Sequence, residues 1–219
     1  MKINLIIPTC SISRFGLLLK TIESIYKGTY LSVCTYVVCD GNFDIHEKIK
    51  ELDFTDVVPL FNSSRKDWVY SVNRVIKHYH SDFYLYASDD IEFKKDTIRV
   101  AMDAMNRYFP DGDGVVNIGR KGRATFGLFG QKLANRFPHS AVFCPDFIHF
   151  GADSELFRTV KELGRIYHIP EEYKVTHHRK KDETYRLARS TRERDLTIFR
   201  TRRELGYKWG IDFNLVKGK

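Results

Sequence analysis

The 219-residue chain has few cysteines, and they are not arranged for metal binding or cross-linking. Its four cysteines, Cys10, Cys34, Cys39 and Cys144, include no C-x-x-C pair and have no histidine at zinc-finger spacing. Cys34 and Cys39 lie in or beside an apolar stretch, where a free buried thiol is the usual arrangement. We therefore expect no disulfides and a reducing compartment.

Long apolar runs are also missing. The opening run at residues 3–8 is far shorter than the roughly 18 residues of a membrane span, and it is too short for a signal peptide. A content of 42% hydrophobic and 14% aromatic residues is typical of a folded globular protein, which excludes wholesale disorder. We expect a soluble, cytoplasmic protein with one large domain, or a core with an appendage.

An excess of one charge sign is absent from most of the chain. The formal net charge is +8, but residues 1–176 hold 23 basic and 22 acidic side chains, whereas residues 177–219 hold 13 and 6. A local basic surface indicates an anionic partner, which the charge alone leaves open as nucleic acid, lipid headgroup or nucleotide.

The first 109 residues alternate between short apolar strands and amphipathic helices. Strands are predicted at residues 3–7, 35–39, 56–61 and 83–87, with helices ending at Gly28 and covering 44–52, 67–79 and 96–109. We expect Asp67 to cap its helix. This alternation with short connections is typical of βαβ units, so the fold class is α/β with a mostly parallel sheet.

The remaining residues are less regular. Residues 110–150 are rich in glycine and predict a loop-rich region lining a cleft, with strands at 115–118 and 147–150 and a basic loop at 120–136. A helix at 153–163 and a strand at 165–169 follow. The charged segment 182–205 has a thin apolar stripe, which predicts a helix packed along the core or a binder of anionic surfaces.

Three acidic sites follow predicted strands, namely Asp40, the pair Asp89-Asp90, and Asp153. The carboxyl ends of parallel strands meet at one rim of the sheet, where ligands bind. Adjacent carboxylates repel unless a cation neutralises them, and hard oxygen ligands suit Mg²⁺ or Mn²⁺. Each acidic site also has a purely structural interpretation. Asp40 can form a turn with Gly41, and Asp153 can cap a helix. The pair Asp89-Asp90 can cap the segment that follows it, with Lys94 and Lys95 as partners.

Several short motifs together resemble the family 2 type of GT-A glycosyltransferase. In that family one strand ends in Pro-Thr, a second ends in an acidic pair before Gly or Asn, and an Asn-containing helix precedes a DXD metal motif. The matching segments here are INLIIPT at 3–9, VVCDGN at 37–42, Asn62 with SVN at 71–73, and LYASDD at 85–90. The segment GADSEL at 151–156 resembles the acceptor-side acidic motif, and His177-His178 the C-terminal metal histidine.

The resemblance covers residues 3–178 in order, with two departures. Cys39 replaces the first acid of the second strand, and Ser88 replaces the first Asp of the metal motif. The resemblance implies a GT-A fold, Rossmann-like with helices flanking the sheet, followed by a basic helical extension. It divides the chain into a nucleotide-sugar-binding half (1–109), an acceptor-side half (110–178) and a basic tail (179–219).

The resemblance also implies residue roles. The implied nucleotide-binding residues are Pro8, Thr9, Asp40, Asn73 and Asp89; the implied ligands of Mn²⁺ or Mg²⁺ are Asp90 and His177 or His178; and the implied general base is Asp153, with Asp146 and Glu155 as rivals. The ion would neutralise charge on the leaving nucleoside diphosphate. The base would take a proton from the acceptor hydroxyl, and attack from the opposite face would invert the anomeric centre.

These implications favour a metal-dependent inverting glycosyltransferase that uses a nucleotide sugar, with a UDP-linked sugar preferred. Its acceptor is a glycan or hydroxymethylated DNA, and the basic tail allows peripheral contact with a membrane. A non-catalytic nucleic-acid-binding protein is the alternative that the tail supports. A nucleotidyltransferase ranks lower, because no glycine precedes Gly16 in the loop after the first strand.

Overall fold

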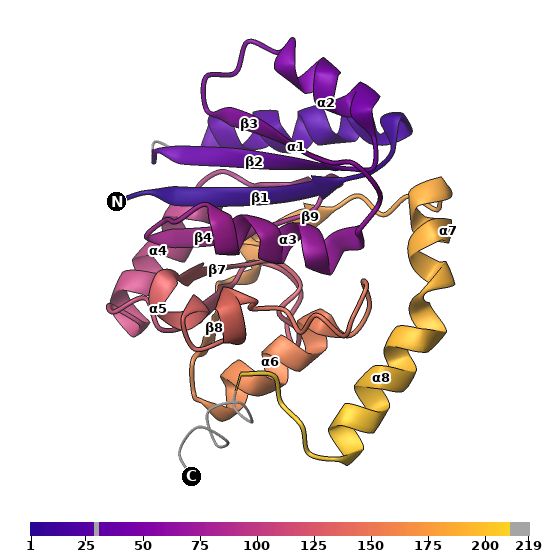
Figure 1. Cartoon of the computed structure of the whole chain (residues 1–219). Helices are drawn as coiled ribbons and strands as arrows, with labels where there is room; N and C mark the ends of the chain where they lie inside the picture. Colours follow the sequence, from indigo (N-terminus) through magenta and orange to yellow (C-terminus); the bar gives the residue numbers. More distant parts are fainter. Residues whose placement is uncertain (29–30, 211–219) are drawn as a thin grey trace.

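A seven-stranded sheet forms the centre of the computed structural model, which describes residues 1–28 and 31–210 (Figure 1). The strand order is β3-β2-β1-β4-β7-β6-β8. The strands are β1 (Ile3–Thr9), β2 (Val33–Asp40), β3 (Val57–Asn62), β4 (Phe83–Tyr86), β6 (Val115–Asn117), β7 (Gly127–Gly130) and β8 (Ile166–His168). Only β7 runs antiparallel to its neighbours, which confirms the predicted mostly parallel sheet.

Helices cover both faces of this sheet. They are α1 (Phe15–Gly28), α2 (Phe43–Lys50), α3 (Asp67–His78), α4 (Thr97–Tyr108), α5 (Gln131–Ala134), α6 (Ala152–Glu162), α7 (Glu183–Ser190) and α8 (Arg192–Glu204), with short 3₁₀ turns at Ile12–Arg14, Pro138–Ser140 and Glu171–Tyr173. No helix in the described part of the chain is both long and apolar enough to cross a membrane.

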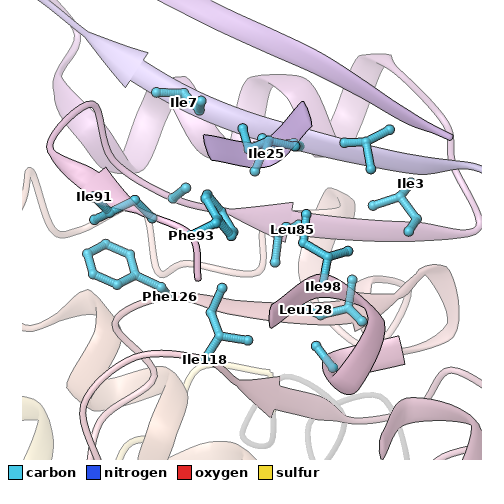
Figure 2. Close-up of a cluster of buried hydrophobic side chains, with 14 of the residues drawn as sticks. Ile3, Ile7, Ile25, Leu85, Ile91, Phe93, Ile98, Ile118, Phe126 and Leu128 are labelled. Carbon is cyan, nitrogen blue, oxygen red and sulfur yellow. The ribbon is translucent and has the colours of Figure 1, made fainter. Parts of the chain in front are cut away.

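The strands are buried on both faces because an apolar cluster lies on each side. Figure 2 shows Ile7, Leu85 and Leu128, from β1, β4 and β7, in the cluster that also takes in α1 and α4. The neighbouring Ile6 points to the other cluster, which contains the apolar face of α3. Successive side chains of a strand alternate between faces, so an uninterrupted apolar run is what a doubly covered strand requires.

The segment 147–150 is not a strand, so this prediction was wrong. Its apolar residues fit a buried strand, but the backbone N–H groups of residues 148–150 donate to the Asp195 side chain of α8. The strand that pairs with β4 on the side away from β1 is β7, which the sequence did not reveal.

A separate two-stranded sheet lies near the place where β1 and β4 end. Strand β5 (Ile91–Glu92) pairs antiparallel with β9 (Thr176–His177), which brings His177 opposite Ile91. The chain then continues into α7 and α8, which follow one another down one side of the molecule (Figure 1). The helix predicted over 182–205 is therefore two helices, and residues 211–219 of the predicted tail lie outside the described residues.

Candidate active site

The acid pair lies where β1 and β4 end side by side. Thr9, the last residue of β1, donates its hydroxyl to Asp89 Oδ2 at 2.8 Å. Asp90 receives the Ser88 hydroxyl, and its Oδ1 lies 3.1 Å from His177 Nε2. Asp89 and Asp90 are only 3% and 5% exposed, so two carboxylates are held in a nearly dry site and need a nearby cation.

Arg14 supplies that cation within the chain. Its Nη1 lies 3.0 Å from Asp89 Oδ1 and 3.2 Å from Asp90 Oδ2. Its Nε and Nη2 donate to the two carboxylate oxygens of Asp182, at 2.7 and 3.0 Å. One buried guanidinium therefore joins the acid pair to the start of α7. Sequence reasoning missed this residue, although a buried acid pair requires a cation and Arg14 is the first one after β1.

The two acids differ in how strongly they hold a proton. Burial and the adjacent Asp90 charge raise the pKa of Asp89, against the opposing effects of Arg14 and Thr9. Burial also acts to raise the pKa of Asp90, but hydrogen bonds from His177 and Ser88 and the Arg14 charge lower it below its usual value. Asp90 is therefore the more persistent anion of the pair.

Asp90 and His177 suit a small divalent ion. An octahedral ion with bonds of about 2.1 Å places neighbouring donor atoms roughly 3 Å apart, close to the 3.1 Å between Asp90 Oδ1 and His177 Nε2. One carboxylate and one imidazole suit Mn²⁺. His178 does not face this position, because its Nε2 lies 2.9 Å from Glu92 Oε2. No group of three or more His, Cys, Asp or Glu side chains gathers for a metal among the described residues, so the rest of a shell would come from substrate and water.

Asp40 holds the start of α3. Its carboxylate accepts the backbone N–H groups of Lys66 and Asp67, at 2.9 and 2.7 Å, and the Asn62 amide at 2.7 Å. Burial raises the pKa of Asp40, and these three hydrogen bonds oppose that effect. The expectation that Asp67 caps α3 was wrong, because Asp67 has φ 66° and its side chain pairs with Arg65 instead. Both Asp40 oxygens are already engaged at the rim of the sheet.

Not all of the other residues of the implied nucleotide pocket lie at this rim. Pro8 and Thr9 are buried at the end of β1, and Thr9 contacts Asp89 of the acid pair. The Asn73 amide instead donates to Phe143 O at 2.7 Å and accepts from Phe143 N at 3.1 Å. Asn73 therefore joins α3 to the loop at residues 141–151, which leads into α6.

Asp153 lies in the first turn of α6 and is half-buried. Its Oδ1 accepts the N–H of Ser154 at 2.8 Å, and its Oδ2 lies 3.3 Å from the Thr125 hydroxyl. The residue that precedes the helix is Gly151, at φ 87°, so Asp153 is not the N-cap. Of the acids considered for the general base, Asp153 is the one that forms no ion pair within the described residues.

The two rival acids are engaged elsewhere. Glu155 is 1% exposed and accepts two bonds of about equal length from Arg202 Nε, at 2.9 Å, with a third from Nη2 at 2.7 Å. Asp146 accepts from Nη1 of the same arginine at 3.0 Å. Both rival acids are therefore paired with Arg202 of α8. Asp153 is the remaining carboxylate of the three, and it is not neutralised by an arginine among the described residues.

The loop at residues 141–151 is held by a second residue of α8. Asp195 is fully buried, and its carboxylate accepts the N–H groups of Ile148, His149 and Phe150 at 3.2, 2.8 and 2.9 Å. Burial lowers the pKa of His149, although Asp67, Asp153 and Asp195 lie near enough to oppose it. Burial therefore favours the neutral form of the His149 imidazole. No sequence motif indicated either residue.

No family model and no curated protein sequence matches the chain. Solved structures match its fold, among them the mannosyltransferase PcManGT from Pyrobaculum calidifontis in complex with GDP-Man and Mn²⁺, at 16% identity and a TM-score of 0.63, over 86% of this chain and 61% of that one. TarS 1–349 of S. aureus in complex with UDP-GlcNAc matches at 15% identity and a TM-score of 0.64, over 84% of this chain and 60% of that one. The chain therefore spans about three fifths of the length of these structures, and it has the GT-A fold predicted from its motifs.

Proposed function

We propose that this protein is a metal-dependent, inverting glycosyltransferase that moves a sugar from a nucleotide sugar to an acceptor hydroxyl. The observation that carries the proposal is the placement of Thr9, Asp89, Asp90 and His177 together at the strand ends of a GT-A sheet. Ligands of open α/β sheets bind at this edge. The solved structures of similar fold include complexes with GDP-Man and with UDP-GlcNAc, which supports a nucleotide-sugar donor.

On the donor side, one set of residues contacts the nucleoside and another would hold the metal. Pro8, Thr9 and Asp89 border the nucleoside, with Asp40 supporting the rim behind them. Asp90 and His177 would hold Mn²⁺ or Mg²⁺, which when bound offsets the negative charge that develops on the departing diphosphate. The Arg14 charge lies 3.0 to 3.2 Å from both carboxylates, so it opposes their protonation and holds them in place before a donor arrives.

On the acceptor side, Asp153 is the general base. Its carboxylate takes the proton of the acceptor hydroxyl as the oxygen forms its bond to the anomeric carbon. The bond from that carbon to the nucleoside diphosphate breaks at the same time, and attack opposite the leaving group inverts the centre. The Thr125 hydroxyl and Ser154 N–H fix the orientation of the carboxylate. The acceptor is a glycan or a hydroxymethylated base in DNA, and a UDP-linked donor is preferred.

The test is a thermal-shift screen of UDP, GDP, CDP and TDP, each with and without Mn²⁺. A ligand at about one hundred times its Kd stabilises the folded state by about 2.7 kcal/mol, which raises the Tm of a chain this long by roughly 5–10 °C. One nucleotide should give this shift only with Mn²⁺, and Asp90→Asn should remove it. Asp103→Asn, an exposed acid of α4, is the matched control and should keep it.

Two results would refute the proposal. The first is the absence of a shift with every nucleotide, which would favour a non-catalytic nucleic-acid-binding protein. The second is an Asp90→Asn variant that binds nucleotide and Mn²⁺ as well as the wild type does.

A further inference from the structure

The charges of the C-terminal helices are sorted between their two sides. Asp182 turns inward to Arg14, and Asp195 turns inward to the backbone of residues 148–150. Most basic side chains remain outside, although Arg202 turns inward to Glu155 and Arg194 pairs with Asp195. Between residues 179 and 204 eight basic residues are exposed, against three exposed acids, Glu183, Glu193 and Glu204. The exposed basic residues are Arg179, Lys180, Lys181, Arg186, Arg189, Arg194, Arg200 and Arg203. Folding therefore concentrates the positive charge that the composition only indicates.

Three of these cations lie beside the acid pair. The backbone N–H of His178 donates to Asp90 O at 2.8 Å, and the Asp182 carboxylate binds Arg14. Only residues 179–181 separate these two anchors. With 3.8 Å between consecutive Cα atoms, their backbone stays within about 8 Å of one anchor. All three side chains are exposed, and none forms an ion pair within the described part of the chain. These three side chains therefore place positive charge close to Asp90, one of the proposed metal ligands.

A second basic segment lies beside the proposed base. Arg120, Lys121 and Arg123 are exposed in the turn that leads into β7. This turn is fixed next to Asp153, because Ala124 N–H donates to the Asp153 carbonyl oxygen at 3.4 Å and the Thr125 hydroxyl lies 3.3 Å from Asp153 Oδ2. The Phe126 ring then lies 5.3 Å from the His177 ring. The turn thus connects the Asp153 side of the site to the metal side.

We propose that the acceptor is a polymer with a phosphodiester backbone, held by these two basic segments and the outer faces of α7 and α8. The inference rests on the proposed function, since it assigns the substrate class of the same site. Positive charge extends along α7 and α8, which are roughly 12 and 20 Å long at 1.5 Å per residue. That extent suits a chain of regularly spaced phosphates better than a single anionic group. Backbone phosphates bound by Lys and Arg position a polymer without reading its other groups.

A membrane surface fits these helices less well. A helix that lies in a membrane interface needs an apolar face toward the lipid. The apolar residues of α8, including Ile198 and Phe199, pack against the core instead. Among the described residues, one large exposed apolar side chain, Leu187, belongs to α7, and none belongs to α8. The outer face of this helix is therefore charged without an apolar anchor.

The test measures binding of a fluorescent 20-residue single-stranded oligodeoxynucleotide, and of an abasic phosphodiester oligomer of equal length, at several salt concentrations. Arg179, Lys180 and Lys181 are replaced together by Gln. The control replaces Lys2, Lys20 and Lys77, three exposed lysines outside this surface, in the same way. If each cation contacts one phosphate, the triple replacement reduces the slope of log K against log salt by about 2, and affinity at low salt falls about tenfold or more.

The expected result is binding that the 179–181 variant weakens and the control variant does not, with the nucleotide-dependent Tm shift unchanged in both. Equal affinity for the two oligomers would identify a sugar-phosphate polymer, and preference for the oligodeoxynucleotide would identify a nucleic acid; both support the proposal. Binding to vesicles containing anionic lipid with no binding to either oligomer would overturn it in favour of a membrane. Equal losses in both variants, or no binding at all, would also overturn it.

The nucleotide screen separates this outcome from failure of the proposed function. Oligomer binding without any nucleotide-dependent shift would refute the acceptor assignment together with the transferase. A nucleotide-dependent shift without oligomer binding would leave the transferase in place and refute the polymer alone.

Discussion

Replacing Asp195 by asparagine should loosen the loop at residues 141–151 without disturbing the acid pair. The Asp195 carboxylate is fully buried and serves three consecutive backbone N–H groups, one through Oδ1 and two through Oδ2. An asparagine side chain has the same shape but only one oxygen, and its NH₂ group cannot accept a hydrogen bond. At least one N–H of residues 148–150 would then be buried without a partner, and the other bonds would lose the charge that strengthens them.

The magnitude follows from these contacts. Hydrogen bonds to charged groups contribute about 1.5–3 kcal/mol each, and a buried donor left without a partner costs about 1–3 kcal/mol. Because the remaining amide oxygen still serves part of the loop, we expect a total loss of about 3 kcal/mol. For a chain of this length that corresponds to a fall in Tm of roughly 6–12 °C.

The assay is thermal unfolding of the variant beside Glu193→Gln, an exposed acid two residues away that should change stability by less than about 0.5 kcal/mol. The variant should still show the nucleotide-dependent shift, because Arg14, Asp89 and Asp90 are untouched. Its transfer rate should fall, since the loop that it loosens leads directly into Gly151 and Asp153. A Tm within about 2 °C of the wild type would correspond to a loss of at most about 1 kcal/mol and would refute the role assigned to Asp195.

Two further predictions concern the acceptor side. Asp153→Asn should keep donor binding and lose about 10²- to 10⁴-fold in transfer rate, measured as release of nucleoside diphosphate with acceptor present; retained transfer would move the base elsewhere. Burial lowers the pKa of His149, so below about pH 6.5 the unfolded chain binds a proton that the folded chain does not. The free energy of unfolding should therefore be highest above this pH and fall as the pH drops through it. His168 should contribute in the same direction, because burial also lowers its pKa. In urea unfolding at pH 5 to 8, His149→Gln should flatten the profile, whereas the same change at the exposed His80 should leave it steep.

The sequence predicted those parts of the fold that depend on local pattern. Uninterrupted apolar runs and helical stripes revealed β1 to β4 and α1 to α4, because burial on both faces and on one face leave different periodicities. Strand β7 was not predicted, because it begins and ends with glycine. A Cβ at Gly127 would lie 2.9 Å from the Tyr86 hydroxyl, and one at Gly130 would lie 2.5 Å from Gly112 O. These close approaches are properties of the assembled sheet and leave no pattern in the strand itself.

The candidate site was predictable where strand ends converge and not where distant segments meet. Asp89 and Asp90 follow β4 directly, so their place at the rim is a consequence of strand order. The Arg14 and Asp182 pair joins residues 168 positions apart, and Asp195 meets residues 45 to 47 positions earlier in the chain. Such pairs depend on tertiary packing and cannot be predicted from a short sequence motif.

The way α7 and α8 are attached decides where the chain can be shortened. A chain ending before residue 182 would remove the Asp182 partner of Arg14, the acceptor of three loop N–H groups, and the arginine paired with Glu155. Glu155 and the loop N–H groups would lose these partners, although no apolar core strand had been removed. A fusion partner or affinity tag is therefore better attached after residue 210 than at the change in composition near residue 179, where the sequence alone suggests a boundary.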